Sequence, residues 1–349
     1  MKKEGYDMKT VTLGSTGITV PQNAFGALPI QRDDTETAVH LLRTAYEGGM
    51  RFFDTARSYT DSEEKVGFAL SDVRDKLYLA TKTGAKTPEE MKRHLETSLT
   101  LLKTDHVDLY QFHCAPRCFR PGDGSGMYEC MEDFKRQGMV RHIGITCHKI
   151  GVAEECVESG LYETMQFPFS YLSGARETAL VRSCETHNMG FIAMKALAGG
   201  LITNARAAFA FISQFDNVLP IWGIQREEEL KQWLSFMDNP AEMDEETAAF
   251  IREDIKNFGA DFCRGCGYCM PCPQGITINQ CARMSLMLRR APSDTWLSDY
   301  WQEEMKKIET CRHCGRCSAH CPYELDTPAL LEKNYEDYQL VLAGKRSVK

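Results

Sequence analysis

The chain of 349 residues lacks any run of about 18 uninterrupted apolar residues, the length that a membrane-spanning helix requires. It also lacks an apolar segment behind the lysines of its first ten residues, so we expect no secretory signal. It has no cluster of basic residues, since 41 lysines and arginines face 49 acidic residues and the formal net charge is −8. We therefore expect neither a membrane span nor a nucleic-acid partner.

Cysteine, in contrast, is abundant, with 15 residues. Eight of them form two tight groups within residues 263–321. A secreted disulfide protein of this cysteine content would be shorter, would carry a signal and would have an even number of cysteines. The distribution instead indicates intracellular metal or iron–sulfur ligation, and it predicts a cytoplasmic protein.

Short β-type segments alternate with helical patterns over most of the chain. We expect strands at residues 23–28, 51–56, 77–83, 108–114, 142–148, 164–170, 190–196 and 218–224. Each is followed by a helix whose apolar residues recur with a spacing near 3.6. Eight such units in one α/β region favour a (β/α)₈ TIM barrel. A doubly wound open sheet also alternates, but it usually has a glycine-rich first turn, which this sequence lacks.

The composition divides the chain into three parts. They are a barrel (residues 1–236), a connecting helix (237–260) and a small helical iron–sulfur domain with a C-terminal tail (261–349). Residues 11–20 are expected to form a hairpin that closes the floor of the barrel. The connecting segment is acidic, and we expect its helix to start near Asp238 or Asn239. In the last part, helical stretches at roughly 277–289 and 297–308 separate the two cysteine groups.

Four polar side chains fall at the carboxyl ends of expected strands, where a barrel of this type carries its chemistry. They are Asp54, Tyr59, Lys82 and His113. Taken singly, each would more often be a cap or a salt bridge. Together they suit proton donation to a carbonyl group, because Lys82 can stabilise the anion of Tyr59. Asp54 would keep that lysine charged, and His113 would donate a hydrogen bond to the substrate oxygen.

The segments FFDTARSYTDSEEKVG, ATKT, DLYQFHC and RHIGIT carry these residues and occur in this order along the chain. They resemble the successive signature segments of the aldo-keto reductases, and the resemblance covers about residues 8–236. It implies an enzyme that interconverts a carbonyl and an alcohol with a nicotinamide coenzyme, usually NADPH. It also implies that the four residues above are the catalytic tetrad of the family.

The coenzyme contacts implied by the resemblance match this sequence less closely. The positions concerned are Thr146, Gln166, Ser170, Gly223, Gln225 and Arg226. Thr146 and Ser170 stand where the family usually has serine and asparagine. Glu229 stands where the family often has a polar or basic residue near the coenzyme phosphate. NADP(H) is the coenzyme we expect, bound in an altered site.

The cysteine groups near the C-terminus have the spacing of ferredoxins. The second reads Cys-x₂-Cys-x₂-Cys-x₃-Cys-Pro, and the first is one residue shorter before its last cysteine. In two-cluster ferredoxins the fourth ligand comes from the other motif, so we expect two [4Fe–4S] clusters with exchanged fourth cysteines. The expected ligands are Cys263, Cys266, Cys269 and Cys321 for one cluster, and Cys311, Cys314, Cys317 and Cys272 for the other.

Two Cys₄ zinc sites are the alternative to these clusters, but zinc rarely needs three cysteines at this spacing followed by Cys-Pro. The tail resembles the helical ferredoxins of respiratory-type iron–sulfur subunits. An aldo-keto reductase barrel with such a tail resembles a bacterial and archaeal subgroup of the family.

Seven cysteines lie outside these ligand sets. Those expected to be buried as small hydrophobic side chains are Cys114, Cys130, Cys156, Cys184 and Cys281. Cys147 and His148 end the fifth expected strand, so a Cys-His nucleophile there is a minor alternative.

Two classes of function follow from these patterns. The first is an oxidoreductase that acts on a small-molecule carbonyl or alcohol and whose clusters exchange electrons with a ferredoxin or another partner. A flavin would be needed to convert two-electron into one-electron chemistry. It stays open as a cofactor, although no flavin motif is readable. The second class is an electron-transfer or redox-sensing iron–sulfur module in which the barrel is mainly a scaffold.

Overall fold

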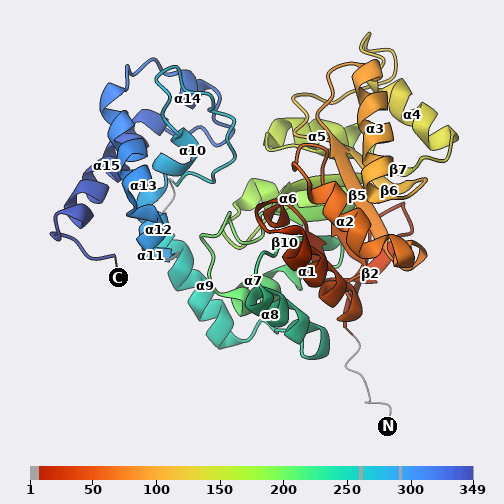
Figure 1. Ribbon diagram of the computed structural model, residues 1–349, viewed down its shortest axis with the longest axis horizontal. Helices are drawn as coiled ribbons and strands as arrows, with labels where there is room; N and C mark the ends of the chain where they lie inside the picture. Colours follow the sequence, from red (N-terminus) through yellow and green to blue (C-terminus); the bar gives the residue numbers. More distant parts are fainter. Residues whose placement is uncertain (1–7, 259–261, 291–292, 349) are drawn as a thin grey trace. The chain divides into compact units, whose positions relative to one another are not determined.

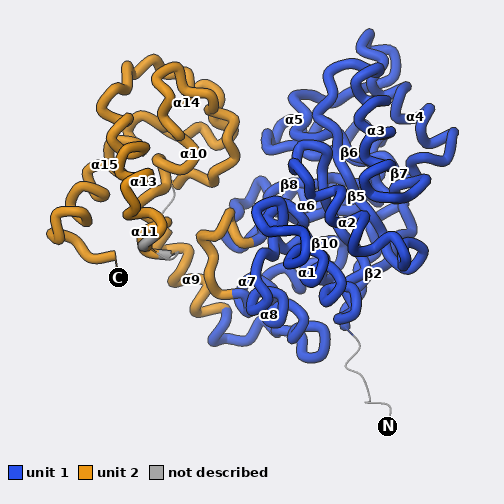
Figure 2. The backbone as a smooth tube through the Cα atoms, viewed as in Figure 1, with its two compact units in different colours: residues 1–196, 205–247 blue, residues 197–204, 248–349 orange. Residues whose placement is uncertain are grey.

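The computed structural model describes residues 8–258, 262–290 and 293–348 (Figure 1). The chain forms two compact units. The first is Met1–Ala196 with Ala205–Thr247, and the second is Leu197–Asn204 with Ala248–Lys349 (Figure 2). The predicted ranges also include residues 1–7, 259–261, 291–292 and 349, and for these the expectations lie outside the described residues. No helix in the described ranges is long and apolar enough to cross a membrane.

The first unit is built on eight parallel strands that close into a barrel in the order β10-β3-β4-β5-β6-β7-β8-β9. These strands are β3 (Ala24–Gly26), β4 (Phe52–Asp54), β5 (Tyr78–Thr83), β6 (Val107–Phe112), β7 (Val140–Thr146), β8 (Thr164–Pro168), β9 (Gly190–Met194) and β10 (Val218–Gly223). Each overlaps the range expected for it, so the predicted TIM barrel is confirmed.

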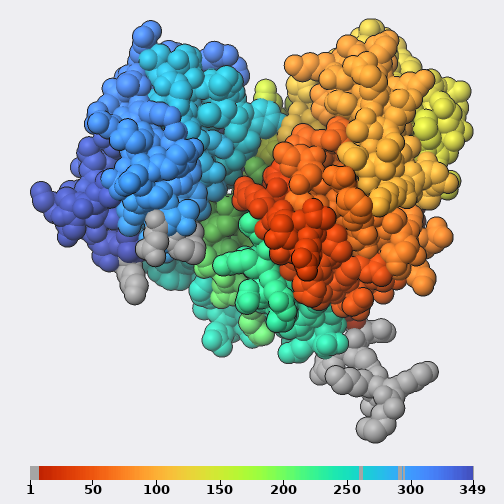
Figure 3. Space-filling view, in the orientation of Figure 1, coloured from red at the N-terminus to blue at the C-terminus, as the bar shows by residue number. Residues whose placement is uncertain are grey.

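Helices follow the strands and surround the barrel (Figure 1). They are α1 (Thr35–Glu47), α2 (Ser62–Leu70), α3 (Pro88–Leu102), α4 (Met127–Arg136), α5 (Ile150–Ser159), α6 (Ala175–Thr186), α7 (Ala205–Ile212) and α8 (Glu227–Asp238). Side-chain caps mark the starts of α1 and α3. Asp34 accepts a hydrogen bond from the amide of Thr37 at 2.8 Å, and Thr87 accepts one from the amide of Glu90 at 3.2 Å. In the space-filling view, the part of the chain drawn from red to orange forms much of the face of the first unit that is turned to the viewer (Figure 3).

The predicted hairpin is present at the start of the described chain. Strands β1 (Thr10–Thr12) and β2 (Thr19–Pro21) pair in antiparallel register, with Val11 opposite Val20. Val11 and Val20 belong to one buried cluster with Phe52, Ala80 and Leu109 of the barrel strands. The hairpin therefore supplies the apolar layer on which the interior of the barrel rests.

The strand periodicity of two places a polar layer directly after this apolar layer. The side chains two residues beyond the apolar layer on β4, β5 and β6 are Asp54, Lys82 and Gln111. They are buried, with exposed fractions of 2% or less. The polar layer therefore lies toward the carboxyl ends of the strands, where a barrel of this type carries its active site.

The connecting segment differs from the expectation in where its helix begins. Helix α8 continues to Asp238, and α9 runs from Glu245 to Phe258. The start near Asp238 or Asn239 was wrong, because Asp244 is the side chain that caps the helix: it accepts a hydrogen bond from the amide of Thr247 at 2.8 Å.

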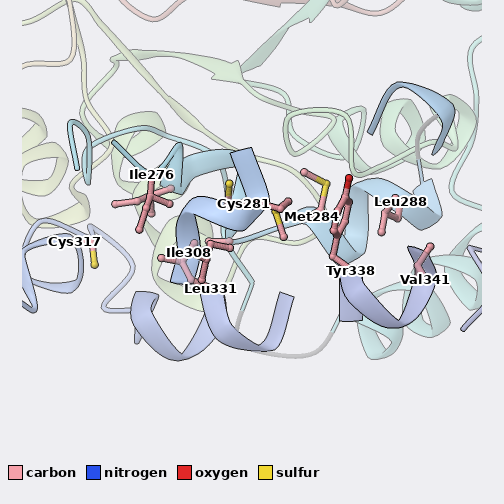
Figure 4. Close-up of a cluster of buried hydrophobic side chains, with 12 residues drawn as sticks. Ile276, Cys281, Met284, Leu288, Ile308, Cys317, Leu331, Tyr338 and Val341 are labelled. Atoms are coloured by element: carbon pink, nitrogen blue, oxygen red, sulfur yellow. The ribbon is translucent and has the colours of Figure 1, made fainter. Parts of the chain in front are cut away.

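The second unit packs short helices around a small apolar core. The helices are α10 (Ile278–Cys281), α11 (Met284–Arg290), α12 (Ser293–Trp296), α13 (Asp299–Lys306), α14 (Arg316–Ala319) and α15 (Thr327–Leu342). Figure 4 shows side chains of α10, α11 and α15 meeting in this core. Sequence analysis missed α15, although Asp326 caps it by accepting from Ala329 at 3.2 Å and Pro328 occupies its first turn.

The packing of α2 against α3 can be tested at Gly67, where the two helices approach closely. A Cβ atom at Gly67 would lie 2.1 Å from the carbonyl oxygen of Leu101, whereas one at Gly151 in α5 would meet only the end of the Arg176 side chain, at 3.9 Å. We expect Gly67→Ala to lower the free energy of unfolding by about 1–3 kcal/mol. The matched helical control Gly151→Ala should leave it unchanged or raise it by up to about 1 kcal/mol. Equal midpoints in thermal unfolding followed by circular dichroism would contradict this packing.

Candidate active site and cysteine-lined cavities

A buried ion pair occupies the polar layer of the barrel. The ammonium of Lys82 donates to Asp54 Oδ2 at 2.5 Å and to the carbonyl oxygen of Thr55 at 2.7 Å. Gln111 Nε2 donates to the other oxygen of Asp54 at 3.4 Å and to Gln166 Oε1 at 3.0 Å. Both charges are therefore compensated inside the barrel, by each other and by neutral polar groups.

Tyr59 lies over this ion pair. Its ring centroid is 5.0 Å from the Lys82 nitrogen, so the phenol lies next to the buried ammonium. The segment after β4 is pinned by backbone hydrogen bonds, from Arg57 to the carbonyl of Lys82 and from Tyr59 to Ala56, each at 3.0 Å. Thr60 follows with a φ of 37°, a strained conformation for a β-branched residue. The loop thus holds the phenol in one position.

His113 is the fourth predicted residue, and it stands beside the tyrosine. The ring centroids of Tyr59 and His113 are 5.7 Å apart, with planes at 80°. The backbone amide of His113 continues the ladder by donating to Thr83 at 2.8 Å, and its Nδ1 lies 3.2 Å from Ser58 Oγ. The structure therefore brings all four predicted tetrad residues together at one end of the barrel.

The pKa shifts of these groups follow from burial and from the ion pair. Burial alone would lower the pKa of Lys82, but the Asp54 carboxylate and Tyr59 raise it above its ordinary value. Burial raises the pKa of Tyr59, and Lys82 opposes this rise. Lys82 acts in the predicted direction, but burial has the larger effect on the phenol. Burial, reinforced by the Lys82 charge, lowers the pKa of His113 to about 3, so that its imidazole is neutral at neutral pH.

Three of the expected coenzyme residues lie in β7 and β8 or just after β8. Thr146 and Gln166 lie opposite each other in the β7–β8 pairing, and both are buried. The Thr146 hydroxyl accepts from the amide of Cys114 at 2.8 Å, and Gln166 is part of the Asp54 network. Ser170 follows β8 in a turn that its hydroxyl stabilises by accepting from Leu172 at 3.2 Å.

The other three expected coenzyme residues lie where β10 leads into α8. Gly223 is the last residue of β10. The amides of Gln225 and Arg226 both donate to Glu229 Oε2, at 3.0 and 3.1 Å, and the guanidinium of Arg226 binds Glu229 Oε1 at 2.6 Å. The carboxylate of Glu229 therefore takes the amides and the cation that were expected to meet a phosphate.

Sequence analysis missed Gln111 and the cavity beside His113. Gln111 is two residues before His113 on the same strand, so the strand periodicity of two could have pointed to it. The cavity, of about 440 Å³, lies between the segments that follow β5 and β6. Its lining includes Lys86, Phe112, His113, Cys114, Arg117 and Phe119.

Two expectations about single cysteines need correction. Cys114 was expected to be buried but is exposed and lines this cavity, because it comes after the end of β6 with a φ of 51°. Cys147 was considered as a nucleophile, but it is fully buried and its thiol lies 3.9 Å from Met165 Sδ. Burial also raises its pKa, so the thiol stays protonated and the Cys-His alternative is disfavoured.

The predicted cluster ligands line two cavities in the second unit. One cavity, of about 20 Å³, is lined by Cys263, Cys266, Cys269 and Cys321. The other, of about 200 Å³, is lined by Cys272, Cys311, Cys314 and Cys317, and also by Cys269. Each cavity therefore brings three cysteines of one motif together with the last cysteine of the other motif. The assignment of these thiols as cluster ligands remains a prediction.

The donor sets consist of thiols alone, and soft thiolate ligands suit iron–sulfur clusters as well as zinc. Zinc would draw four thiolates to about 2.3 Å from one ion. Among the residues that the structure describes, no three His, Cys, Asp or Glu side chains converge closely enough to hold a single metal ion. In a [4Fe–4S] cluster each thiolate binds a different iron atom, so the thiolates surround a cavity instead of a point.

Two known families match different parts of the chain. The family described as "Aldo/keto reductase family" matches residues 23–218. The "4Fe-4S dicluster domain" matches residues 262–326. The first match spans the barrel strands up to the start of β10, and the second spans both cysteine motifs.

Curated relatives are similar to the barrel region. "Uncharacterized oxidoreductase YrpG" of Bacillus subtilis (strain 168) is 31% identical over 226 residues, which cover 56% of this chain and 68% of YrpG. "Aldo-keto reductase YhdN" of the same strain is 27% identical over 215 residues, which cover 56% of this chain and 64% of YhdN.

Solved structures support the fold. Aldo-keto reductase AKR11C1 from Bacillus halodurans (holo form) has a TM-score of 0.63 at 20% identity, covering 71% of this chain and 96% of its own. An aldo-keto reductase from Klebsiella pneumoniae in complex with NADPH has a TM-score of 0.60 at 22% identity, covering 70% and 94%. Since the family match alone spans more than half of the 349 residues, this protein belongs to the aldo/keto reductase family and carries a C-terminal 4Fe-4S dicluster domain.

Proposed function

We propose that this protein reduces an aldehyde or ketone to an alcohol with NADPH, and that its two [4Fe–4S] clusters exchange electrons with a ferredoxin or another partner. The observation that carries the first part is the Tyr59 ring held over the buried Lys82–Asp54 pair. Membership of the family supports the reaction class. The NADPH complex of the Klebsiella pneumoniae relative supports the choice of coenzyme.

In this proposal Tyr59 is the proton donor. Its raised pKa keeps the hydroxyl protonated at neutral pH, so the proton is available when negative charge develops on the carbonyl oxygen. Lys82 then stabilises the phenolate that remains, and water restores the proton. The neutral imidazole of His113 has one N–H group, which donates to the same oxygen and orients it.

NADPH, when bound, supplies the hydride that the carbonyl carbon accepts. We propose that Thr146, Gln166 and Ser170 orient the nicotinamide. Gly223, Gln225 and Arg226 would hold the phosphate groups at the start of α8. Binding a phosphate there requires Glu229 to release the two backbone amides and the guanidinium that it now engages.

The same Glu229 contacts favour a second candidate function. If the carboxylate of Glu229 remains on the amides of Gln225 and Arg226, the coenzyme site is blocked at its phosphate end. The barrel would then act mainly as a scaffold for an electron-transfer or redox-sensing iron–sulfur module. The two candidates differ in whether NADPH is oxidised stoichiometrically with formation of an alcohol.

For the clusters we propose the ligand sets that line the two cavities. The first set is Cys263, Cys266, Cys269 and Cys321, and the second is Cys272, Cys311, Cys314 and Cys317. The match of the dicluster domain supports iron–sulfur clusters in this part of the chain. A flavin remains open as the group that would join two-electron and one-electron steps.

The role of Tyr59 is tested by Tyr59→Phe, which keeps the ring and removes the proton. We expect kcat for reduction of 4-nitrobenzaldehyde by NADPH to fall by about 10²–10⁴-fold, with little change in NADPH affinity. The control is Tyr128→Phe, which removes a hydroxyl that donates to Leu161 at 2.7 Å outside the polar layer. It should leave kcat unchanged. Full activity of Tyr59→Phe would refute the proton-donor role.

The role of Asp54 is tested through the pH profile of Asp54→Asn. Without the carboxylate, burial lowers the pKa of Lys82, so the lysine loses its charge at a lower pH. The alkaline fall of kcat/KM should therefore begin at a lower pH than in the parent protein. The free energy of unfolding should also fall by about 3–5 kcal/mol, because one buried charge loses its partner.

Asp108→Asn is the matched control for this experiment. It breaks another buried pair, since Asp108 accepts from Arg74 at 2.7 Å, but it leaves the polar layer intact. We expect reduced stability with an unchanged pH profile. If both variants showed the same pH profile as the parent protein, Asp54 would not be setting the charge of Lys82.

The crossed ligand sets are tested by removing each motif's last cysteine. Anaerobically prepared protein should hold about eight iron and eight sulfide per chain. Cys321→Ala should damage the cluster of Cys263, and Cys272→Ala the cluster of Cys311. Electron paramagnetic resonance of the reduced protein gives the readout, with triple-cysteine variants of each motif as reference spectra. Loss of the Cys311 cluster in Cys321→Ala and of the Cys263 cluster in Cys272→Ala would contradict the crossed ligand sets. Bound zinc without sulfide would contradict the presence of iron–sulfur clusters.

A further inference from the structure

Arg283 is a buried cation in the second unit that the proposed function does not use. It lies between α10 and α11 and is 6% exposed. Its Nε donates to Gln280 Oε1 and its Nη2 donates to the carbonyl oxygen of Gly199, both at 3.1 Å. Both acceptors are neutral, so these contacts hold the guanidinium in place without neutralising it.

The guanidinium lies directly against the first cysteine motif. A Cβ atom at Gly265 would be 2.8 Å from Arg283 Nη1, so only glycine leaves room for the cation there. The amide of Gly265 in turn donates to Cys263 Sγ at 3.4 Å. The cation thus lies beside the loop that carries a predicted cluster ligand.

A buried guanidinium is costly unless a negative charge compensates it. The four thiolates around a [4Fe–4S] core make the cluster with its ligands anionic, and reduction adds a further negative charge. A cluster in the first cavity would supply the counter-charge that the contacts of Arg283 lack. The guanidinium would in turn favour the reduced form of that cluster.

We propose that Arg283 raises the reduction potential of the cluster bound by Cys263, Cys266, Cys269 and Cys321, and that Gly199 fixes the guanidinium in the position where it does so. The proposal rests on the ligand assignment above. Arg283 is a positioning and charge-compensating residue, since it touches a ligand loop and not a substrate.

Gly199 belongs to the segment 197–204, which follows β9 in the sequence but is part of the second unit. Gly199 has a φ of +68°, and a Cβ atom there would lie 2.9 Å from Arg283 Nη1. The neighbouring Gly200 has a φ of +91°, with nothing within 4 Å of its Cβ position. A change in this segment should therefore alter the cluster only when it moves the guanidinium.

The first experiment is an anaerobic redox titration of the full chain, followed by electron paramagnetic resonance. In Arg283→Gln the midpoint potential of the Cys263 cluster should fall, and that of the Cys311 cluster should stay. Arg283→Lys, which keeps the charge, should restore most of the difference. The control Arg289→Gln removes a cation that pairs with Asp337 at 2.6 Å, and it should change neither potential.

The second experiment compares Gly199→Ala with Gly200→Ala, which impose similar backbone strain. Only the first should shift the potential of the Cys263 cluster, because only the first displaces the guanidinium. If Arg283→Gln does not retain its iron, the comparison of Gly199→Ala with Gly200→Ala tests the proposal in its place. If iron and sulfide contents are normal, an unchanged potential of the Cys263 cluster in Arg283→Gln would overturn the proposal. If Arg283→Gln cannot be titrated, an unchanged potential in Gly199→Ala would overturn it. Absence of clusters from the parent protein would instead refute the ligand assignment.

Discussion

The buried pair of Lys82 and Asp54 is the constraint on which the active end of the barrel depends. Two charges with exposed fractions of 2% or less are stable only if each has its partner and the remaining hydrogen-bonding capacity is used. Gln111 and Thr55 use that capacity. The same pair places a positive charge next to Tyr59, and this charge opposes the rise in the pKa of the phenol that burial causes.

The second unit has a small apolar core and two cavities lined by cysteines. The protonation state of these thiols is therefore the main constraint on this unit. Burial raises the pKa of Cys269 to about 12, so its thiol is neutral unless a metal displaces the proton. Cluster binding would therefore contribute folding free energy to this unit. A bound cluster would also supply the negative charge that the buried guanidinium of Arg283 lacks in its protein contacts.

Much of the fold and of the tetrad could be predicted because the signals are local. Strand periodicity and helix caps mark the eight βα units, and Tyr59 and Lys82 follow from where the strands end. The missed features depend on contacts between distant segments. Gln111 matters because of Asp54 on another strand, and Glu229 because its carboxylate bends back onto backbone amides. The exposure of Cys114 and the role of Arg283 likewise appear only once loops are placed. Helix α15 is an exception, since its cap and its proline were readable.

The central claim is that the barrel transfers a hydride to a carbonyl carbon, with the clusters as separate electron carriers. The most direct measurement uses NADPH carrying two deuterium atoms at C4, with 4-nitrobenzaldehyde as acceptor under anaerobic conditions, and mass spectrometry of the product. Our account predicts 4-nitrobenzyl alcohol with one deuterium on the carbinol carbon, formed in equal amount to the NADPH consumed. Oxidation of NADPH with bleaching of the clusters, and with no labelled alcohol, would contradict it.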